Sequence, residues 1–365
     1  MQVMSSEKTS AMDYLGELFL VGFEGKELNS DTSAFLSQAR IGGVILFAHN
    51  YESPEQIATL INQVQECRSG LPLWISTDHE GGRVQRFKEP FTIIPSAQTL
   101  FQHNTPRSIF EVSQIAAKEL HAVGVNLNFA PVCDILTNPE NTVIGDRAYA
   151  KTEDEVSRVV TAVVRGHITN GVQPCVKHFP GHGDTLLDSH DDLPRINTPL
   201  QTLRNREFRP FIRCFKSRCS MVMLAHILNP EVDPDHPSTF SSKWIQDILR
   251  KDIRYQKLII SDDMEMGAIT KHYNEEEVPG KALRAGCDIL IYRSEEKARK
   301  AYQSALKEIE EGTLSPSIIL ESAKRARDIK RDFFKDEYQD INPKQVREIV
   351  GCQEHQDIVN KLSNG

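Results

Sequence analysis

Histidines and aspartates are concentrated in residues 177–192, which read KHFPGHGDTLLDSHDD and contain three of the former and four of the latter. Two glycines and a proline lie among them, and this suits neither a helix nor a strand. Imidazole and carboxylate groups can bind metal ions, and they can also transfer protons. The stretch is therefore a candidate metal site, a candidate acid/base loop or a polar surface turn.

A metal site would draw on four side chains, which are His178, His182, His190 and Asp262. Two histidines separated by three residues usually chelate from one face of a helix, and Pro180, Gly181 and Gly183 prevent a helix here. Lys177 and Arg147 would add positive charge beside the cation. We therefore expect no metal ion and no other cofactor.

An acid/base pair makes fuller use of the same loop. Asp188 lies two residues before His190, so in an extended or turn segment both side chains can face the same way and hydrogen-bond. A carboxylate bonded to one ring nitrogen orients the imidazole, fixes its tautomer and favours its protonated form. Such proton transfer typically accelerates a reaction about 10²–10⁴-fold. Asp262 could then act as the nucleophile.

Eight short apolar runs are the elements that would position these groups. They are residues 18–23, 43–48, 73–78, 125–130, 172–178, 221–226, 257–262 and 288–292. Their near-continuous apolarity is typical of buried parallel strands. Chemistry-bearing side chains stand at or after the ends of these runs, among them Asp78, Arg86, Asp134, Arg147, Lys177, His178, His226 and Asp262.

Helical patterns alternate with the apolar runs. Residues 53–56 and 152–155 each place a hydroxyl cap before a capping-box side chain. Further helices are predicted near residues 30–39, 107–122, 199–216, 242–254, 276–286, 294–311 and 316–335. Eight strand–helix pairs predict an α/β fold, a single (β/α)₈ TIM-type barrel, whose reactive groups lie at the carboxyl ends of the strands. A doubly wound open sheet is the alternative, because periodicity does not show closure.

Bulk properties narrow the class of protein. The net charge of −8 argues against a nucleic-acid or anionic-membrane partner. The opening residues do not resemble a signal peptide, and no apolar run approaches the roughly 20 residues of a membrane span. The seven cysteines form no C-x-x-C pair, which favours free thiols in a cytoplasmic protein. We expect residues 1–335 to form the barrel and residues 336–365 a helical tail on its outside.

Three segments together carry a resemblance to a known family. They are TDHEGGRVQR (77–86), KHFPGHGDTLLDSH (177–190) and ISDDMEMGAI (260–269). In order and spacing the chain resembles family 3 glycoside hydrolases of the NagZ type, which are β-N-acetylglucosaminidases, over about residues 12–335. The segment that ends in DSH discriminates against the β-glucosidase branch of the family, whose acid/base group typically comes from outside this loop.

The resemblance implies a retaining, two-step hydrolysis. Asp262 would be the nucleophile, His190 the acid/base group, and Asp188 the residue that orients His190. The sugar would be held by Asp78, Arg86, Arg147, Lys177 and His178. The implied substrate is an N-acetylglucosaminyl muropeptide, in which N-acetylglucosamine is linked to 1,6-anhydro-N-acetylmuramic acid. The resemblance further implies peptidoglycan recycling in a bacterial cytoplasm, and we expect a monomer.

Some features of the sequence depart from the family pattern, and some predictions have alternatives. Position 79 is His where the family more often has Gln, and many relatives carry a second domain for which the residues after 335 are too few. His182 and Asp184 are expected only to support the bend at Pro180, Gly181 and Gly183. With the glycines as hinges, the loop is expected to move His190 over the glycosidic bond that is cleaved. The alternatives are a metal-dependent barrel hydrolase, a β-glucosidase, a glycosidase that uses phosphate as acceptor, and a sugar-binding protein without activity.

Overall fold

The structure, a computed structural model, describes residues 2–68, 70–185, 189, 192–335 and 338–363 of the 365-residue chain. Within these ranges a closed parallel barrel runs in the order β1-β10-β9-β8-β7-β6-β3-β2, and β2 pairs with β1. Its strands are β1 (Phe19–Val21), β2 (Gly43–Leu46), β3 (Trp74–Thr77), β6 (Leu127–Asn128), β7 (Gln173–Phe179), β8 (Met221–Leu224), β9 (Leu258–Asp263) and β10 (Ile289–Tyr292). Every barrel strand has two neighbours, which confirms the predicted (β/α)₈ barrel and excludes the open sheet.

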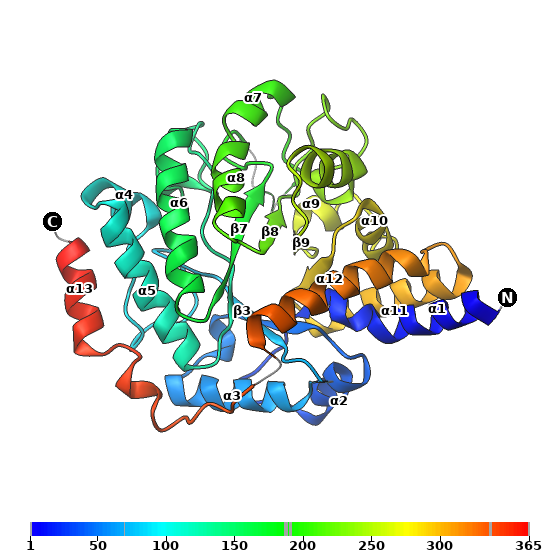
Figure 1. The fold of residues 1–365 in the computed structure, drawn as a ribbon, viewed down its shortest axis with the longest axis horizontal. Coiled ribbons are helices and arrows are strands. Elements are labelled where there is room, and N and C mark those ends of the chain that lie inside the picture. Colours follow the sequence, from blue (N-terminus) through cyan, green and yellow to red (C-terminus); the bar gives the residue numbers. More distant parts are fainter. Residues whose placement is uncertain (1, 69, 186–188, 190–191, 336–337, 364–365) are drawn as a thin grey trace.

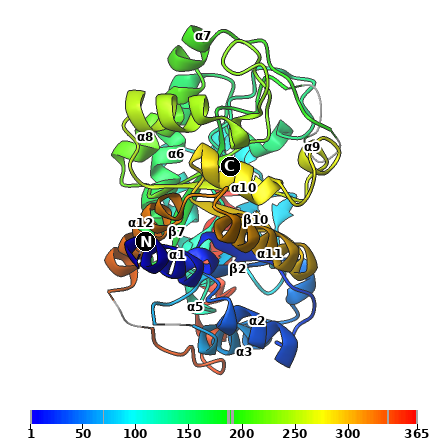
Figure 2. The same ribbon diagram turned by 90° about the vertical axis from the view of Figure 1, so that its right-hand side faces the viewer.

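Helical segments cover the outside of the barrel (Figure 1). Those between barrel strands are α2 (Ser30–Gln38), α3 (Pro54–Glu66), α4 (Ala97–His103), α5 (Pro106–Ala122), α6 (Glu153–Ile168), α7 (Leu200–Asn205), α8 (Phe208–Lys216), the π-helix Lys243–Asp252, α9 (Gly267–Thr270) and α10 (Val278–Ala285). After the last strand come α11 (Glu295–Glu311) and α12 (Pro316–Phe334). Figures 1 and 2 place α2 and α3 on one side and α7 and α8 on the opposite side, as the strand order requires.

The two predicted capping boxes differ in detail from the structure. Ser53 accepts the Gln56 N–H as predicted, but the Gln56 side chain accepts the N–H of Glu52 instead of that of Ser53. Thr152 donates its hydroxyl to Glu155 (Oγ1–Oε2 2.6 Å) and makes no capping bond to the backbone, so the capping box predicted there is wrong. Both helices nevertheless begin where the sequence indicates.

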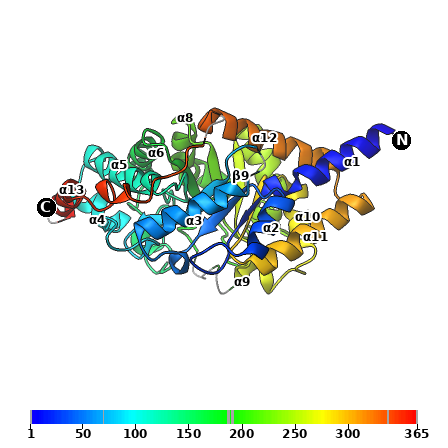
Figure 3. The ribbon, with the colours of Figure 1, turned by 90° about the horizontal axis from the view of Figure 1, so that it is seen from below.

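Both chain ends pack outside the barrel. Helix α1 (Gln2–Tyr14), which was not predicted, lies beside α11 and α12, while α13 (Gln353–Ser363) lies beside α4 and α5. Figure 3 shows the two ends far apart along the long axis of the molecule. The tail before α13 passes along α3, where Arg347 Nε donates to Glu55 (2.6 Å).

Alternating side chains of the strands fill the barrel. The inward set is Leu20, Ile45, Trp74, Leu127, Phe129, Cys175, Met221, Met223, Leu258, Ile260, Ile289 and Ile291. Intervening residues such as Val222 and Ile259 pack against the helices instead. Phe333 and Phe334 of α12 contact Trp74 (ring centroids 5.4 and 4.9 Å apart) and cover the amino-terminal end of the barrel. The carboxyl-terminal end is therefore the open one.

An unpredicted insertion lies between β3 and α5. It contains the hairpin of β4 (His79–Gly81) and β5 (Val84–Gln85), followed by α4. The hairpin carries the DHEGGR segment directly from the end of β3, so its side chains stay at the open end of the barrel.

Candidate active site

Strand alternation carries polar side chains to the open end of the barrel. Lys177 comes two residues after the inward-facing Cys175, and Asp262 comes two residues after Ile260. Because side chains alternate along a strand, both turn inward, and Asp78 follows the same rule after β3. All three line a cavity of about 450 Å³, a size typical of small-molecule sites.

Asp78 accepts hydrogen bonds from two cationic side chains. Lys177 Nζ lies 2.7 Å from its Oδ1, and Arg86 Nη2 lies 3.0 Å from its Oδ2. Burial alone would raise the pKa of Asp78, but Lys177 and Arg86 outweigh it and hold the pKa well below its usual range. The Nε of Arg86 is buried and has no hydrogen-bond partner among the described residues.

Glu80 joins two cations of the cavity and was not among the predicted site residues. Its carboxylate binds Arg147 bidentately (Nε–Oε2 2.9 Å, Nη2–Oε1 2.8 Å) and lies 2.6 Å from Lys177 Nζ. Burial favours a higher pKa, but the charges of Arg147 and Lys177 lower the pKa of Glu80 to about 2. The bidentate pair fixes the plane of the Arg147 guanidinium. The only signal for Glu80 in the sequence was its place inside the DHEGGR segment.

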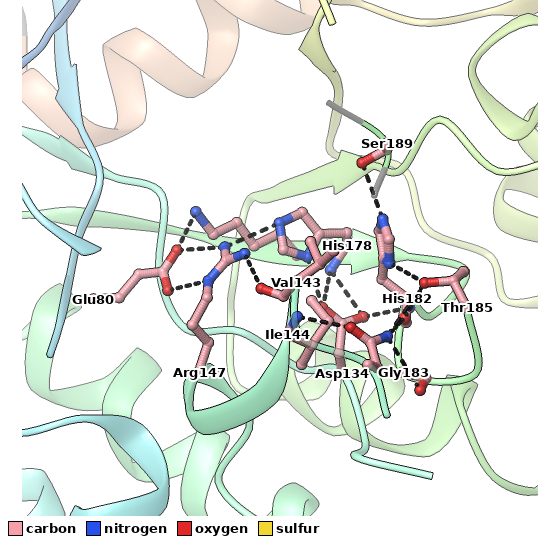
Figure 4. Close-up of polar contacts among 12 residues, drawn as sticks. Glu80, Asp134, Val143, Ile144, Arg147, His178, His182, Gly183, Thr185 and Ser189 are labelled. Carbon is pink, nitrogen blue, oxygen red and sulfur yellow. Dashed lines mark hydrogen bonds and ion pairs between the residues drawn. The ribbon is translucent and has the colours of Figure 1, made fainter. Parts of the chain in front are cut away.

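His178 lines the cavity together with its neighbour Lys177, because the pairing of β7 with β8 shifts register at this point. Asp134 lies beneath the ring, with its Oδ2 2.6 Å from Nδ1 (Figure 4). Arg147 Nη2 lies 3.4 Å from Nε2 on the other side. A carboxylate can only accept, so Nδ1 of the ring carries the proton of its contact with Asp134. Asp134, previously noted only as a polar loop residue, thus orients His178.

Asp262 presents its carboxylate to the cavity from the end of β9. Its Oδ1 accepts the N–H of Asp263 at 2.8 Å. Burial raises the pKa of Asp262, but His178, His226 and that hydrogen bond lower it, and the lowering prevails. Asp263 differs, because burial raises its pKa to about 7. Asp262 is therefore the better nucleophile of the pair.

The loop after β7 is closely packed over its first residues. Gly181 has φ of +127°, and a Cβ on Gly183 would lie 1.6 Å from the carbonyl oxygen of Ile135. His182 donates its N–H to Asp134 (2.7 Å) and lines the cavity, which is more than the supporting role predicted for it. Asp184 accepts from Thr198 Oγ1 at 2.8 Å, as a residue that supports the bend would. This packing favours a fixed bend at residues 181–183, while movement of the loop stays a prediction.

The predicted acid/base pair, Asp188 and His190, lies outside the described residues. Ser189 between them is described and buried, and its Oγ lies 3.1 Å from His182 Nε2. The five predicted sugar-binding residues, by contrast, all line the one cavity; they are Asp78, Arg86, Arg147, Lys177 and His178. The structure thus brings these five together with Asp262.

His79, the residue that departs from the family, faces away from this cavity. Its ring packs against Phe87 and Phe91, with centroids 6.0 and 5.8 Å away. Burial lowers the pKa of His79 to about 3, so the ring is neutral.

Two kinds of feature are absent from the described part of the chain. Its ranges contain no set of three or more His, Cys, Asp and Glu side chains that could hold a metal ion. Nor do they contain a helix that is long and apolar enough to cross a membrane.

Similarity to known proteins agrees with this geometry. Residues 11–329 match the family model described as the N-terminal domain of glycosyl hydrolase family 3. A Methylococcus capsulatus protein named Beta-hexosaminidase is 37% identical over 297 residues, which are 80% of this chain and 86% of that one. An Idiomarina loihiensis protein of the same name is 35% identical over 276 residues, 74% and 82% of the two chains. A solved glycoside hydrolase family 3 β-N-acetylglucosaminidase from Paenibacillus sp. matches with a TM-score of 0.91 at 33% identity, over 96% of this chain and 68% of that chain.

Proposed function

This chain belongs to glycosyl hydrolase family 3 and is a β-N-acetylhexosaminidase, and from that premise we propose that it releases terminal β-linked N-acetylglucosamine with retention of configuration. The observation that supports the proposal most directly is Asp262, an ionised carboxylate that lines a cavity ringed by hydrogen-bonding groups. Retention follows when such a carboxylate attacks and is then itself displaced.

In the first step Asp262 attacks the anomeric carbon. A bond forms between its carboxylate oxygen and that carbon while the bond to the leaving oxygen breaks. His190 donates its proton to the leaving oxygen, and Asp188 orients the imidazole. Because the imidazolium becomes neutral as it donates, no second anion is left beside Asp262.

In the second step water replaces the carboxylate. Neutral His190 takes a proton from the water, whose oxygen bonds to the anomeric carbon as the ester bond to Asp262 breaks. The two inversions together give retention. The roles of His190 and Asp188 rest on their positions in the DSH segment.

Five side chains hold the sugar. Asp78 accepts from hydroxyl groups, while Arg86, Arg147 and Lys177 donate to hydroxyl and carbonyl oxygens. His178, oriented by Asp134, lines the same cavity. The apolar part of the lining gives a surface against which the sugar ring and the acetamido methyl can pack; it comprises Ile45, Phe47, Phe129, Met223, Met266 and Ile291.

The physiological substrate we propose is the N-acetylglucosaminyl muropeptide, with hydrolysis in the bacterial cytoplasm during peptidoglycan recycling. This part rests on the resemblance to the NagZ type. All seven cysteines carry free thiols, six of them buried, which suits a reducing compartment. We also propose that the enzyme acts as a monomer. In the described part of the chain, only Ile93 and Ile349 are large hydrophobic residues with exposed side chains, too few for an apolar interface.

Trapping the intermediate tests the mechanism. A 5-fluoro β-N-acetylglucosaminide slows the second step, and we expect mass spectrometry to find the sugar on the peptide that contains Asp262. A label on another residue, or none during turnover, would contradict the assignment.

Parallel assays with a β-glucoside, a chelator, and added phosphate test the alternatives, because each alternative predicts its own change in rate or product. Formation of N-acetylglucosamine 1-phosphate would show that phosphate serves as the acceptor.

His190→Ala tests the acid/base assignment. A good leaving group departs without a proton, so kcat/KM should fall much less for an activated aryl glycoside than for a disaccharide. Equal losses on both substrates would count against His190 as the acid.

A further inference from the structure

The guanidinium of Arg83 binds a turn of the long segment that follows β6. Arg83 lies at the tip of the hairpin formed by β4 and β5. Its Nη2 lies 2.8 and 2.7 Å from the carbonyl oxygens of Thr142 and Val143, and its Nε donates to Asp146 Oδ1 at 3.1 Å. Because the donors of a guanidinium are held in one plane, these bonds fix the turn at residues 142–146 relative to the hairpin.

This turn has little apolar packing of its own. The buried apolar side chains between residues 136 and 148 form a small cluster separate from the main core; they are Leu136, Ile144 and Ala148. The position of the turn therefore depends on hydrogen bonds to neighbouring segments. Asn141 supplies such bonds toward the loop after β7, where its Nδ2 donates to the carbonyl oxygen of His182 (2.7 Å). Arg83 supplies them toward the hairpin.

The carbonyl oxygen of Val143 connects Arg83 to Arg147, one of the five proposed sugar-binding residues. It accepts from Arg83 Nη2 at 2.7 Å and from Arg147 Nη1 at 3.2 Å (Figure 4). A carbonyl oxygen has two lone pairs and can accept both bonds. Glu80 binds the Nε and Nη2 edge of Arg147 and belongs to the same hairpin as Arg83. The hairpin thus contacts Arg147 directly through Glu80 and indirectly through the turn.

Arg83 also lines the mouth of the cavity, so a direct contact with substrate is the alternative role. Its side chain is 48% exposed, whereas that of Arg147 is 11% exposed. Two of its three guanidinium nitrogens, Nε and Nη2, already donate to the turn. This use of its donors favours a role within the protein.

We propose that Arg83 is a positioning residue for Arg147, which fixes the 142–146 turn and thereby places the guanidinium that binds the sugar. The inference rests on the proposed function, because it takes Arg147 as a sugar-binding residue. A displacement of about 1 Å in a group that positions a substrate can cost about 10²-fold in rate. Glu80 still binds Arg147 when Arg83 is replaced, so the loss is smaller than that.

A double-mutant cycle tests the proposal. Arg83→Gln should lower kcat/KM for an activated β-N-acetylglucosaminide about tenfold, and Arg147→Ala alone should lower it about 10²-fold. In the Arg147→Ala enzyme the guanidinium to be placed is gone, so adding Arg83→Gln should cost less than about twofold. Arg83→Lys keeps the charge at the mouth but not the planar set of donors, and it should lose about as much as Arg83→Gln.

Arg347→Gln is the matched control. Arg347 is also half-exposed, its Nε donates to Glu55 at 2.6 Å, and it does not line the cavity. Its replacement should leave kcat/KM unchanged. Asp146→Asn is a milder second variant, because it weakens only the bond to Arg83 Nε; it should lose about two- to threefold, and again only when Arg147 is present. Thermal melting reports whether each variant folds.

The outcomes separate the inference from the function on which it rests. If Arg83→Gln costs nothing, or costs as much in the Arg147→Ala enzyme as in the parent, the positioning role is wrong while the sugar-binding role of Arg147 stands. If Arg83→Lys restores full kcat/KM, charge at the mouth is what counts, and the positioning role is again wrong. If Arg147→Ala alone leaves kcat/KM unchanged, the proposed sugar-binding assignment fails, and the inference fails with it.

Discussion

Two aspartates at opposite ends of the barrel each bind two cationic side chains. Asp78, after β3 at the open end, accepts from Lys177 and from an arginine. Asp288, just before β10 at the end covered by α12, accepts from Arg250 (Nη2–Oδ2 2.6 Å) and from Arg325.

The two carboxylates differ in what remains for a ligand. Asp288 also accepts from Ser322 Oγ (2.9 Å) and from the N–H of Ile259 (2.9 Å), and its side chain is 0% exposed. Its four acceptor sites are therefore used by the protein. Among the described residues, the side chain of Asp78 accepts from two donors only, and it is 15% exposed where the cavity reaches it. The same pairing thus stabilises the fold at one end and keeps hydrogen-bonding capacity for a sugar at the other.

The largest effect should come from Asp262→Ala at the open end. Without the nucleophile no glycosyl ester can form, and we expect kcat to fall about 10⁴–10⁶-fold, as for other lost nucleophiles. The midpoint of thermal unfolding should fall somewhat, because the surroundings that lower the pKa of Asp262 stabilise its carboxylate in the folded chain. Turnover of an activated β-N-acetylglucosaminide and a melting curve measure both. Residual activity within tenfold of the parent enzyme would contradict the role of Asp262.

Asp288→Asn and Asp78→Asn form a matched pair that tests the comparison itself. Asp288→Asn leaves two buried guanidinium groups without their anion, so the free energy of unfolding should fall by about 3–5 kcal/mol. The kcat of the folded fraction at low temperature should not change. Urea unfolding and activity per folded molecule are the measurements.

Asp78→Asn should show the opposite pattern. Lys177 keeps Glu80 as a partner and Arg86 is partly exposed, so the loss of stability should be smaller than for Asp288→Asn, while kcat/KM falls about 10²-fold because an ionised acceptor for sugar hydroxyls is lost. The contrast between the two ends of the barrel is wrong if both variants lose mainly stability.

Much of this contrast could be predicted from the sequence, because it follows from strand periodicity. Apolar runs that end in Asp78, Lys177 and Asp262 placed these residues at the ends of strands, and alternation then turns them inward. The contacts of Glu80 could not be predicted in this way. They join it to Arg147, 67 residues away, through an unpredicted hairpin.

The contact between Asp134 and His178 could not be predicted from strand periodicity either. It lies 44 residues before His178, and the contact depends on where β7 shifts register. Strand periodicity predicts which face of the sheet a side chain takes. It predicts neither a local break in that alternation nor the residue that the side chain contacts across the barrel.

A smaller, pH-dependent effect should come from Glu207, a buried acid near the loop after β7. One carboxylate oxygen binds Arg206 (2.5 Å), while the other is buried with no hydrogen-bond partner in the described part of the chain. Burial raises the pKa of Glu207 to about 7. Between the ordinary carboxyl pKa of 4.5 and about 7, the folded chain binds more protons than the unfolded chain, so stability falls as the pH rises through this window.

Glu207→Gln should therefore stabilise the protein at pH 8, by on the order of 2 kcal/mol, and have little effect at pH 4.5. Urea unfolding at the two pH values measures this difference. Glu308→Gln, which changes a carboxylate that pairs with the half-exposed Arg284, is the control and should show no such gain at pH 8. A gain that is equal at both pH values would mean that packing, and not ionisation, explains the result.

The smallest effect should come from His79→Gln, which restores the residue more common in the family. His79 stands between Asp78 and Glu80, and alternation turns its ring away from the cavity toward Phe87 and Phe91. We expect kcat/KM to stay within about twofold and the free energy of unfolding to change by about 1 kcal/mol or less. Because burial keeps the pKa of His79 near 3, the ring stays neutral across the assay range, and the pH profile of kcat/KM should not move. A shifted profile would mean that His79 acts electrostatically on the cavity through Asp78 or Glu80. The distinction between residues that contact the sugar and residues that support the barrel would then be wrong for His79.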